Sequence, residues 1–164
     1  MGRQRRANEA GHRPKFLAVV DGTPECGRAL RFAARRAGRT NAGVILLCLI
    51  APPEGEIWLG VGDLMQAEAE AEAEAQLASA AAQVRQAAGL ESECLIRTGD
   101  KPTELLKLIE TDDDIAILVL AAGMGRDGPG PLVTALAGKT VGSFPIPVAI
   151  VPGHLSDGDI DALA

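Results

Sequence analysis

A glycine-rich stretch in the second half of the chain has the residue types of a phosphate-binding loop. Residues 125–128 (GRDG) are followed by nine residues and then by residues 138–140 (GKT), and they come soon after the apolar run 115–121. Glycines let backbone N–H groups approach a ligand that a Cβ atom would hold away. A helix that begins just beyond them directs its free N–H groups and its positive dipole end to the same place. The stretch therefore predicts an anion site suited to phosphate.

Two better-known nucleotide motifs are excluded by position and spacing. Residues 123–128 fit the pattern G-x-G-x-x-G, but a dinucleotide site follows the first strand of its domain, whereas this stretch follows the fourth. A Walker A loop needs a glycine five residues before Gly138, where the chain has Val133. Neither His12 nor His154 is placed for acid–base work, and the chain has no G-x-S-x-G or H-E-x-x-H motif. We expect no catalytic residue and no metal site.

The elements that must position the glycine-rich stretch alternate between strands and helices. This alternation predicts right-handed βαβ crossovers and an α/β fold with a five-stranded parallel sheet, doubly wound in the order 3-2-1-4-5. Ligands of such sheets bind beyond the carboxyl ends of the strands, where the winding reverses. Asp21 and the glycine-rich stretch should therefore face one crevice. We expect strands at 15–21, 43–51, 90–97, 115–121 and 147–152, and helices at 24–38, 63–88, 102–110, 132–141 and 156–163.

Two of these helices depend on local residue chemistry. Thr23 is a candidate N-cap of the first helix, with Pro24 at its first position. The Ala-Glu run 68–74 imitates the period of a strand, but alanine and glutamate are strong helix formers and poor strand formers. We therefore expect a helix there with a solvated acidic face. We interpret residues 112–114, three consecutive aspartates, as a polar turn.

Composition limits the class of protein. The 164 residues are 47% hydrophobic and only 2% aromatic, which suits one domain with an aliphatic core. The net charge of −6 argues against nucleic-acid binding, and no apolar stretch is long enough for a membrane span. Three widely spaced cysteines indicate a reduced, cytoplasmic protein. We divide the chain into a flexible, solvated basic tail (1–14), a domain (15–152) and a C-terminal extension (153–164); the alternative for the tail is a contact with nucleic acid or an acidic partner.

The chain resembles the universal stress protein family over about residues 15–152. Residues 20–23 (VDGT) are similar to the family's opening VDGS turn, and residues 145–152 resemble its closing CPVLVV element. The glycine-rich stretch fits the family's nucleotide motif G-x2-G-x9-G-(S/T) through Gly125, Gly128 and Gly138. The resemblance implies the adenine nucleotide alpha hydrolase-like fold and a site for ATP or AMP, with Mg²⁺ accompanying ATP.

The resemblance also implies roles for single residues. Asp21 would hydrogen-bond the adenine or the ribose, Leu49 would pack on the base, and the glycines would let backbone amides meet the phosphates. Lys139 stands where ATP-binding members have Ser or Thr; its ammonium either serves the phosphates or its bulk fills their place, and Thr140 would supply a hydroxyl from the next position. The implied site residues are Asp21, Gly22, Thr23, Leu49, Gly125, Gly128, Gly138, Lys139 and Thr140.

The expected function follows from these implied residues. Relatives form dimers through the last strand, and residues 147–151 of this chain present an apolar edge that a partner copy should cover. We expect a cytoplasmic stress-response homodimer that binds an adenine nucleotide as a regulatory ligand, with at most slow ATP hydrolysis. Two alternatives stay open: a nucleotide-free dimeric adaptor of the same fold, and an enzyme of that fold.

Overall fold

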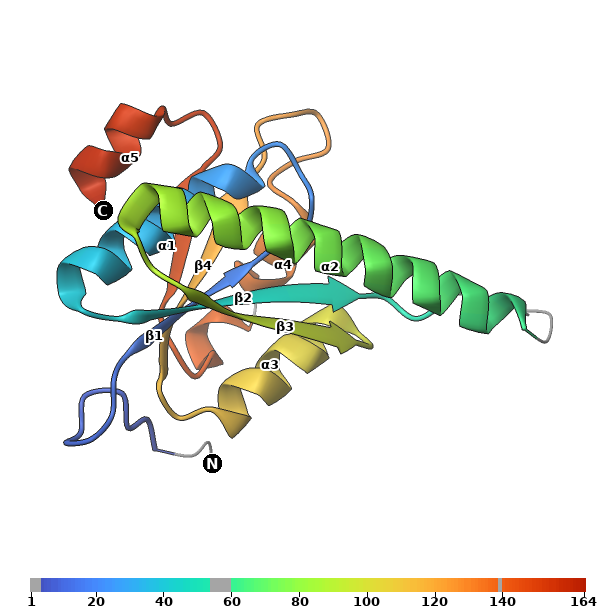
Figure 1. Ribbon diagram of the computed structural model, residues 1–164, viewed down its shortest axis with the longest axis horizontal. Helices are drawn as coiled ribbons and strands as arrows, with labels where there is room; N and C mark the ends of the chain where they lie inside the picture. The colour runs from blue at the N-terminus through green and yellow to red at the C-terminus, as the bar shows by residue number, and fades with distance from the viewer. Residues whose placement is uncertain (1–3, 54–59, 139) are drawn as a thin grey trace.

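Within residues 4–53, 60–138 and 140–164, which the computed structural model describes, five parallel strands form one sheet (Figure 1). The order β3-β2-β1-β4-β5 and the all-parallel pairing confirm the expected doubly wound topology. The central strand β1 and its neighbour β2 are near-continuous apolar runs because they are buried on both faces. The strands are β1 (Lys15–Val19), β2 (Gly43–Ile50), β3 (Ser92–Thr98), β4 (Ile115–Ala122) and β5 (Val148–Pro152).

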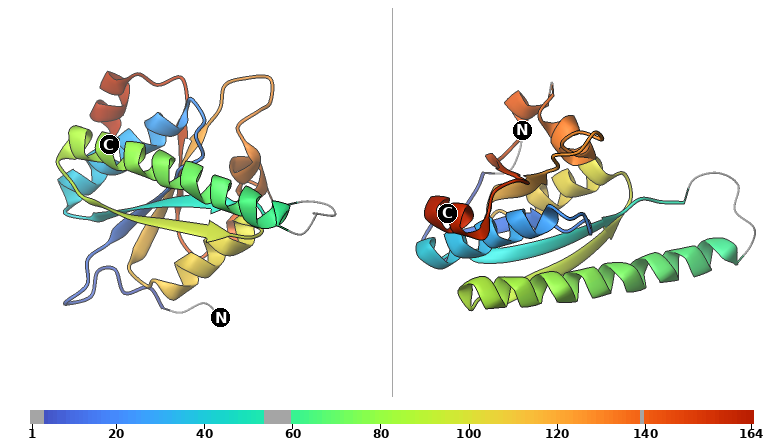
Figure 2. Two further views of the ribbon diagram at one scale, coloured as in Figure 1. Left: turned by 45° about the vertical axis from the view of Figure 1, so that its right-hand side comes forward. Right: turned by 90° about the horizontal axis from the view of Figure 1, so that it is seen from above.

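The helices form one layer on each face of the sheet (Figure 2). On one face lie α1 (Cys26–Thr40), α2 (Val61–Ala88) and α5 (Asp157–Leu163); on the other lie α3 (Lys101–Thr111) and α4 (Pro131–Leu136). Alternate side chains of β1 supply the two cores. Phe16 and Ala18 belong to the cluster under α1 and α2, whereas Leu17 and Val19 belong to the cluster under α3 and α4.

Helix α2 confirms the interpretation of the Ala-Glu run. Residues 68–74 are helical, and their four glutamates are exposed. The second half of the helix packs on the sheet through Ala73, Leu77, Ala80 and Val84, a spacing typical of one helical face. The helix ends at Gly89, whose φ of +68° suits glycine at a helix C-terminus.

The start of α1 differs from the prediction. The helix begins at Cys26 after an N-cap, Glu25, whose side chain makes no capping hydrogen bond. Thr23 instead donates from its backbone N–H (3.1 Å) and its hydroxyl (2.7 Å) to Oδ1 of Asp21. An aspartate two residues earlier offers this local turn, which competes with a helix cap for the threonine. The predicted N-cap role of Thr23 is therefore wrong.

Helix α4 is also shorter than predicted. It ends at Leu136 rather than at Val141, and a separate 3-10 turn, η1, covers Val141–Ser143. Two glycines, Gly138 and Gly142, interrupt this part of the chain, and glycine costs a helix about 1 kcal/mol relative to alanine. The end of the glycine-rich stretch consequently lies beyond the helix.

Residues 4–14, which we expected to form a flexible, solvated tail, make several contacts with the body of the protein, although most of them are exposed. The guanidinium of Arg5 donates to the carbonyl oxygens of Ile109 (2.6 Å) and Asp112 (3.0 Å), where α3 ends. Ala7 is only 4% exposed, and Nδ1 of His12 lies 2.6 Å from a carboxylate oxygen of Asp114. The last carbonyls of a helix lack intrahelical donors and carry partial negative charge, which attracts a cation.

The C-terminal extension docks on α1 through α5. The capping box expected at Ser156 and Asp159 is present. Ile160 is completely buried, and the guanidinium of Arg31 makes two 2.8 Å hydrogen bonds to the carboxylate of Asp161. Among the described residues, none of the helices combines the length and apolar character that a membrane crossing requires.

Candidate functional site

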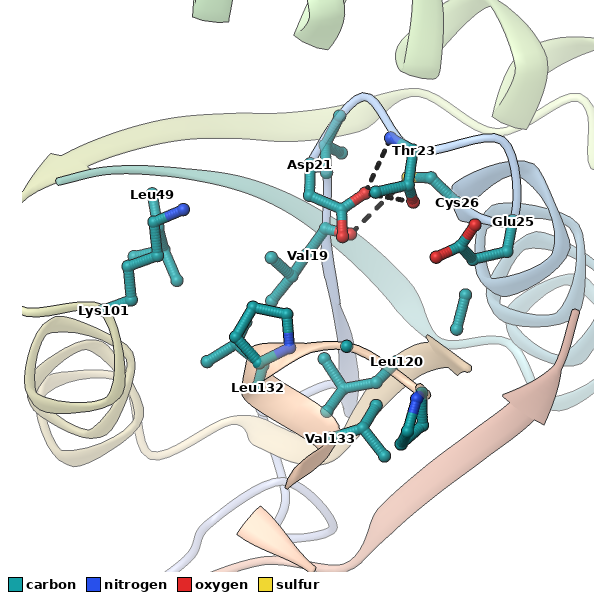
Figure 3. A pocket seen from close by; sticks show the side chains of 15 residues that line it. Val19, Asp21, Thr23, Glu25, Cys26, Leu49, Lys101, Leu120, Leu132 and Val133 are labelled. Atoms are coloured by element: carbon teal, nitrogen blue, oxygen red, sulfur yellow. Dashed lines mark hydrogen bonds between the residues drawn. The ribbon is translucent and has the colours of Figure 1, made fainter. Parts of the chain in front are cut away.

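A pocket opens at the carboxyl ends of β1, β2 and β4, where the winding of the sheet reverses (Figure 3). It encloses about 630 Å³ of atom-free space, part of it open to solvent. The lining comes from these strand ends, the starts of α1 and α3, and residues 129–133.

The turn after β1 holds a carboxylate over the pocket. Asp21 is exposed, and both hydrogen bonds from Thr23 go to its Oδ1 atom. In Figure 3 the carboxylate points into the cavity between the labelled side chains. A carboxylate fixed in this way can accept hydrogen bonds from a ligand's hydroxyl or amino group.

The inner wall of the pocket is apolar. Leu49, at the end of β2, is 7% exposed, and Val19, Leu120 and Val133 lie further along the same wall. Such a surface can pack against a flat, weakly polar ring. Lys101, the first residue of α3, also lines the pocket, on the side of Leu49.

The first turn of α1 closes the other side of the pocket. The carboxylate of Glu25 lies against the beginning of the glycine-rich loop, because a Cβ atom placed on Gly123 would be 2.9 Å from its Oε1 atom. Cys26 donates from Sγ to the carbonyl oxygen of Val19 at 3.7 Å. Burial raises the pKa of this thiol to about 11, so it is protonated at neutral pH and is a poor nucleophile.

The glycine-rich loop is tied by hydrogen bonds within itself. Gly123 donates its N–H to the carbonyl oxygen of Pro129, and Gly128 donates its N–H to that of Gly125, both at 3.1 Å. Gly130, with a φ of +114°, is the glycine of this loop that lines the pocket.

Three of the residues expected at the site come together in the structure. Asp21, Thr23 and Leu49 line the pocket, whereas Gly125, Gly128 and Gly138 are not part of its lining. Gly22, with a φ of +72°, turns toward a separate groove beside α2. The hydroxyl of Thr140 donates to the carbonyl oxygen of Ala135, away from the pocket. Lys139 lies outside the described residues.

Sequence reasoning missed two charged residues of the pocket, Glu25 and Lys101. Lys101 had a usable signal, because it follows the third strand at the same sheet edge as Asp21. Glu25 gave none, since its position depends on how the first turn of α1 packs against the loop after β4. Among the described residues, no three His, Cys, Asp or Glu side chains gather in a way that would hold a metal ion.

The fold and the pocket define an α/β protein with a pocket at the switch point of its sheet. Residues 12–152 match the model of the universal stress protein family, and the chain belongs to this family. A comparison with curated proteins gives no match.

Solved structures share this fold at low sequence identity. The universal stress protein UspA from Lactobacillus plantarum is 17% identical, with a TM-score of 0.73, over 84% of this chain and 97% of that one. The universal stress protein from Archaeoglobus fulgidus in complex with dAMP is 21% identical, with a TM-score of 0.59, over 84% and 96%. A family member from Arabidopsis thaliana with AMP bound is 18% identical, with a TM-score of 0.56, over 85% and 91%.

Proposed function

We propose that this protein binds an adenine nucleotide, ATP or AMP, in the pocket at the carboxyl ends of β1, β2 and β4. The observation that carries the proposal is the convergence of a fixed carboxylate, Asp21, and an apolar wall that includes Leu49 on one pocket. Asp21 accepts hydrogen bonds from the ribose hydroxyls or the adenine amino group, and Leu49 packs on the base. The dAMP and AMP complexes of two relatives with this fold support the assignment.

The phosphates extend toward the glycine-rich loop, past Gly125 and Gly128. Mg²⁺ accompanies ATP. The ligand acts as a regulator rather than a substrate. Hydrolysis is slow at most.

Calorimetry tests the proposal directly. We expect AMP and Mg²⁺–ATP to release or absorb heat on binding, and to raise the melting temperature. Ligand at one hundred times its Kd adds about 2.7 kcal/mol of stability, so the melting temperature should rise by several degrees. Asp21→Ala should weaken binding, while Glu110→Ala, which changes an exposed carboxylate of α3 outside the pocket lining, should not. No heat and no shift at millimolar nucleotide would contradict the proposal.

We propose further that two copies associate through β5 in a cytoplasmic stress-response dimer. β5 is an edge strand, and its Ile150 side chain is 41% exposed beside the half-buried Val148 and Ala149. An apolar edge of this kind pairs readily with a second chain. Light scattering should give twice the 17.0 kDa mass of the chain. Ile150→Lys should yield monomers. Val141→Lys is the control and should not, because Val141 is also exposed (50%) but lies outside β5. A monomeric wild type would refute the dimer.

A nucleotide-free dimeric adaptor is the second candidate. The internal hydrogen bonds of the loop favour this candidate, because the N–H groups of Gly123 and Gly128 already donate to the carbonyl oxygens of Pro129 and Gly125. It predicts that Gly125→Val leaves partner binding and the melting temperature unchanged when ATP is present. A melting temperature that ATP raises in the wild type but not in Gly125→Val would favour nucleotide binding instead.

A further inference from the structure

Three charged side chains line the described part of the pocket, with Lys101 and Glu25 at opposite sides and Asp21 between them. Lys101 lies near Leu49 at the end of β2, and Figure 3 shows Glu25 on the opposite side. The carboxylate of Glu25 lies against Gly123, which follows β4. The Cβ atom of Glu25 is 3.1 Å from the place where a Cβ atom on Gly153, after β5, would lie. Because β1 and β4 stand between β2 and β5, and neighbouring strands are about 4.8 Å apart, the ends of β2 and β5 are about 14 Å apart.

The acidic side is also the side of the glycine-rich loop. Under the proposed function, the base occupies the side of Leu49, and the phosphates point toward the loop. There they meet the carboxylate of Glu25. Among the described residues that line the pocket, Lys101 is the only cationic side chain, and it lies at the opposite side.

Some N–H groups of the loop are not available to offset this negative charge. The N–H groups of Gly123 and Gly128 are bonded to carbonyl oxygens of the loop itself. Pro129 and Pro131 have no N–H group at all. Pro131 is also the first residue of α4, whose six residues give only a short stack of peptide dipoles.

From these observations we infer that the pocket selects adenine ligands by charge, and that Glu25 is the residue that sets the selection. The inference rests on the proposed function. The nucleoside adenosine binds more tightly than the AMP dianion, and metal-free ATP binds most weakly. A divalent cation bound to the phosphates restores part of the affinity for ATP, because it neutralises charge that faces Glu25.

Titration of the full-length protein with adenosine and with AMP, both in EDTA, tests this order. We expect adenosine to bind wild type about tenfold more tightly than AMP, the equivalent of about 1.4 kcal/mol. Glu25→Gln keeps the size of the side chain, removes its charge and breaks no cap bond, since the Glu25 side chain caps nothing. This variant should bind AMP about as tightly as adenosine. About 1 M salt should also reduce the difference between the affinities of wild type for adenosine and for AMP, because it shortens the screening length to about 3 Å.

Glu110→Gln is the matched control. It removes one negative charge from an exposed residue near the C-terminal end of α3, so it changes the net charge equally without touching the pocket. It should leave the adenosine-to-AMP ratio at its wild-type value. Equal affinities of wild type for adenosine and AMP, or a ratio that Glu25→Gln does not change, would overturn charge selection while leaving nucleotide binding intact. If no adenine compound binds, the proposed function itself fails, and charge selection fails with it.

Discussion

Replacing Ile160 with alanine should destabilise the protein measurably, although the residue lies in the C-terminal extension. Its side chain is 0% exposed and belongs to the core cluster under α1 and α2. Truncating a buried isoleucine to alanine costs about 2–5 kcal/mol, through lost burial and the cavity that remains. Helix α5 has seven residues at the end of the chain and can shift into the vacated space. We therefore expect a loss near the lower end, about 2 kcal/mol.

Urea unfolding at neutral pH measures this loss, with Leu163→Ala as the control. Leu163 is on the same helix but is 65% exposed, so its truncation should change the free energy of unfolding by less than about 0.5 kcal/mol. Ile160→Ala should lower the midpoint without changing the slope against urea. In thermal unfolding, about 2 kcal/mol corresponds to a fall of about 4–8 °C. Equal, small effects of the two substitutions would show that α5 does not dock on α1.

Three further outcomes follow from the described contacts. Gly123→Ala should lower the melting temperature, because its new Cβ atom would lie 2.9 Å from a carboxylate oxygen and 3.1 Å from a backbone oxygen. Gly125→Ala should not, because its Cβ atom would meet open space. Equal melting temperatures of the two variants would refute this prediction. Hydrogen bonds from arginine lower the folded-state pKa of Asp161, so its stabilisation is present above the unfolded value of about 3.8 and is lost as pH falls through the folded value. Asp161→Asn should therefore melt below wild type at pH 7 and together with it in strong acid, and a difference that persists there would contradict the assignment. Iodoacetamide at pH 8 should label the exposed Cys94 before Cys26, whose pKa is about 11; mass spectrometry that finds both labelled at equal rates would argue against a buried Cys26.

The parts of the fold that the sequence predicts well are those in which pattern and propensity agree. The apolar run 43–51 is recognisable as a buried strand because every position faces a helical layer, and β2 covers Gly43–Ile50. The Ala-Glu run is recognisable as a helix because propensity opposes its apparent period. The alternation of strands and helices and the handedness of the crossovers then limit the sheet to a few orders, of which the structure has β3-β2-β1-β4-β5.

The differences from the prediction arise where a residue has more than one possible partner, either nearby or far along the chain. Thr23 can cap a helix or close a turn on Asp21, and only the path of the chain into α1 decides between them. The N-terminal arginines resemble a solvated tail, but Arg5 meets helix carbonyls that lie 104 residues further along the chain. No local pattern encodes such contacts, because they exist only after the sheet has brought distant segments together.

The same limit explains why the charge of the pocket was not predicted. Glu25 is set against the glycine-rich loop by neighbours from elsewhere in the chain: Gly153 donates its N–H to the carbonyl oxygen of Ala122 at 2.9 Å, which brings the end of β5 against the first turn of α1. Arg28, one turn along α1, then donates to the carbonyl oxygen of Leu155 and pairs with α5. The C-terminal extension, which lies outside the segment that matches the family, thus helps to fix the carboxylate that we assign to ligand selection. The glycine motif lies in one loop, whereas the carboxylate that we assign to ligand selection is positioned by contacts from other elements, which no local pattern encodes.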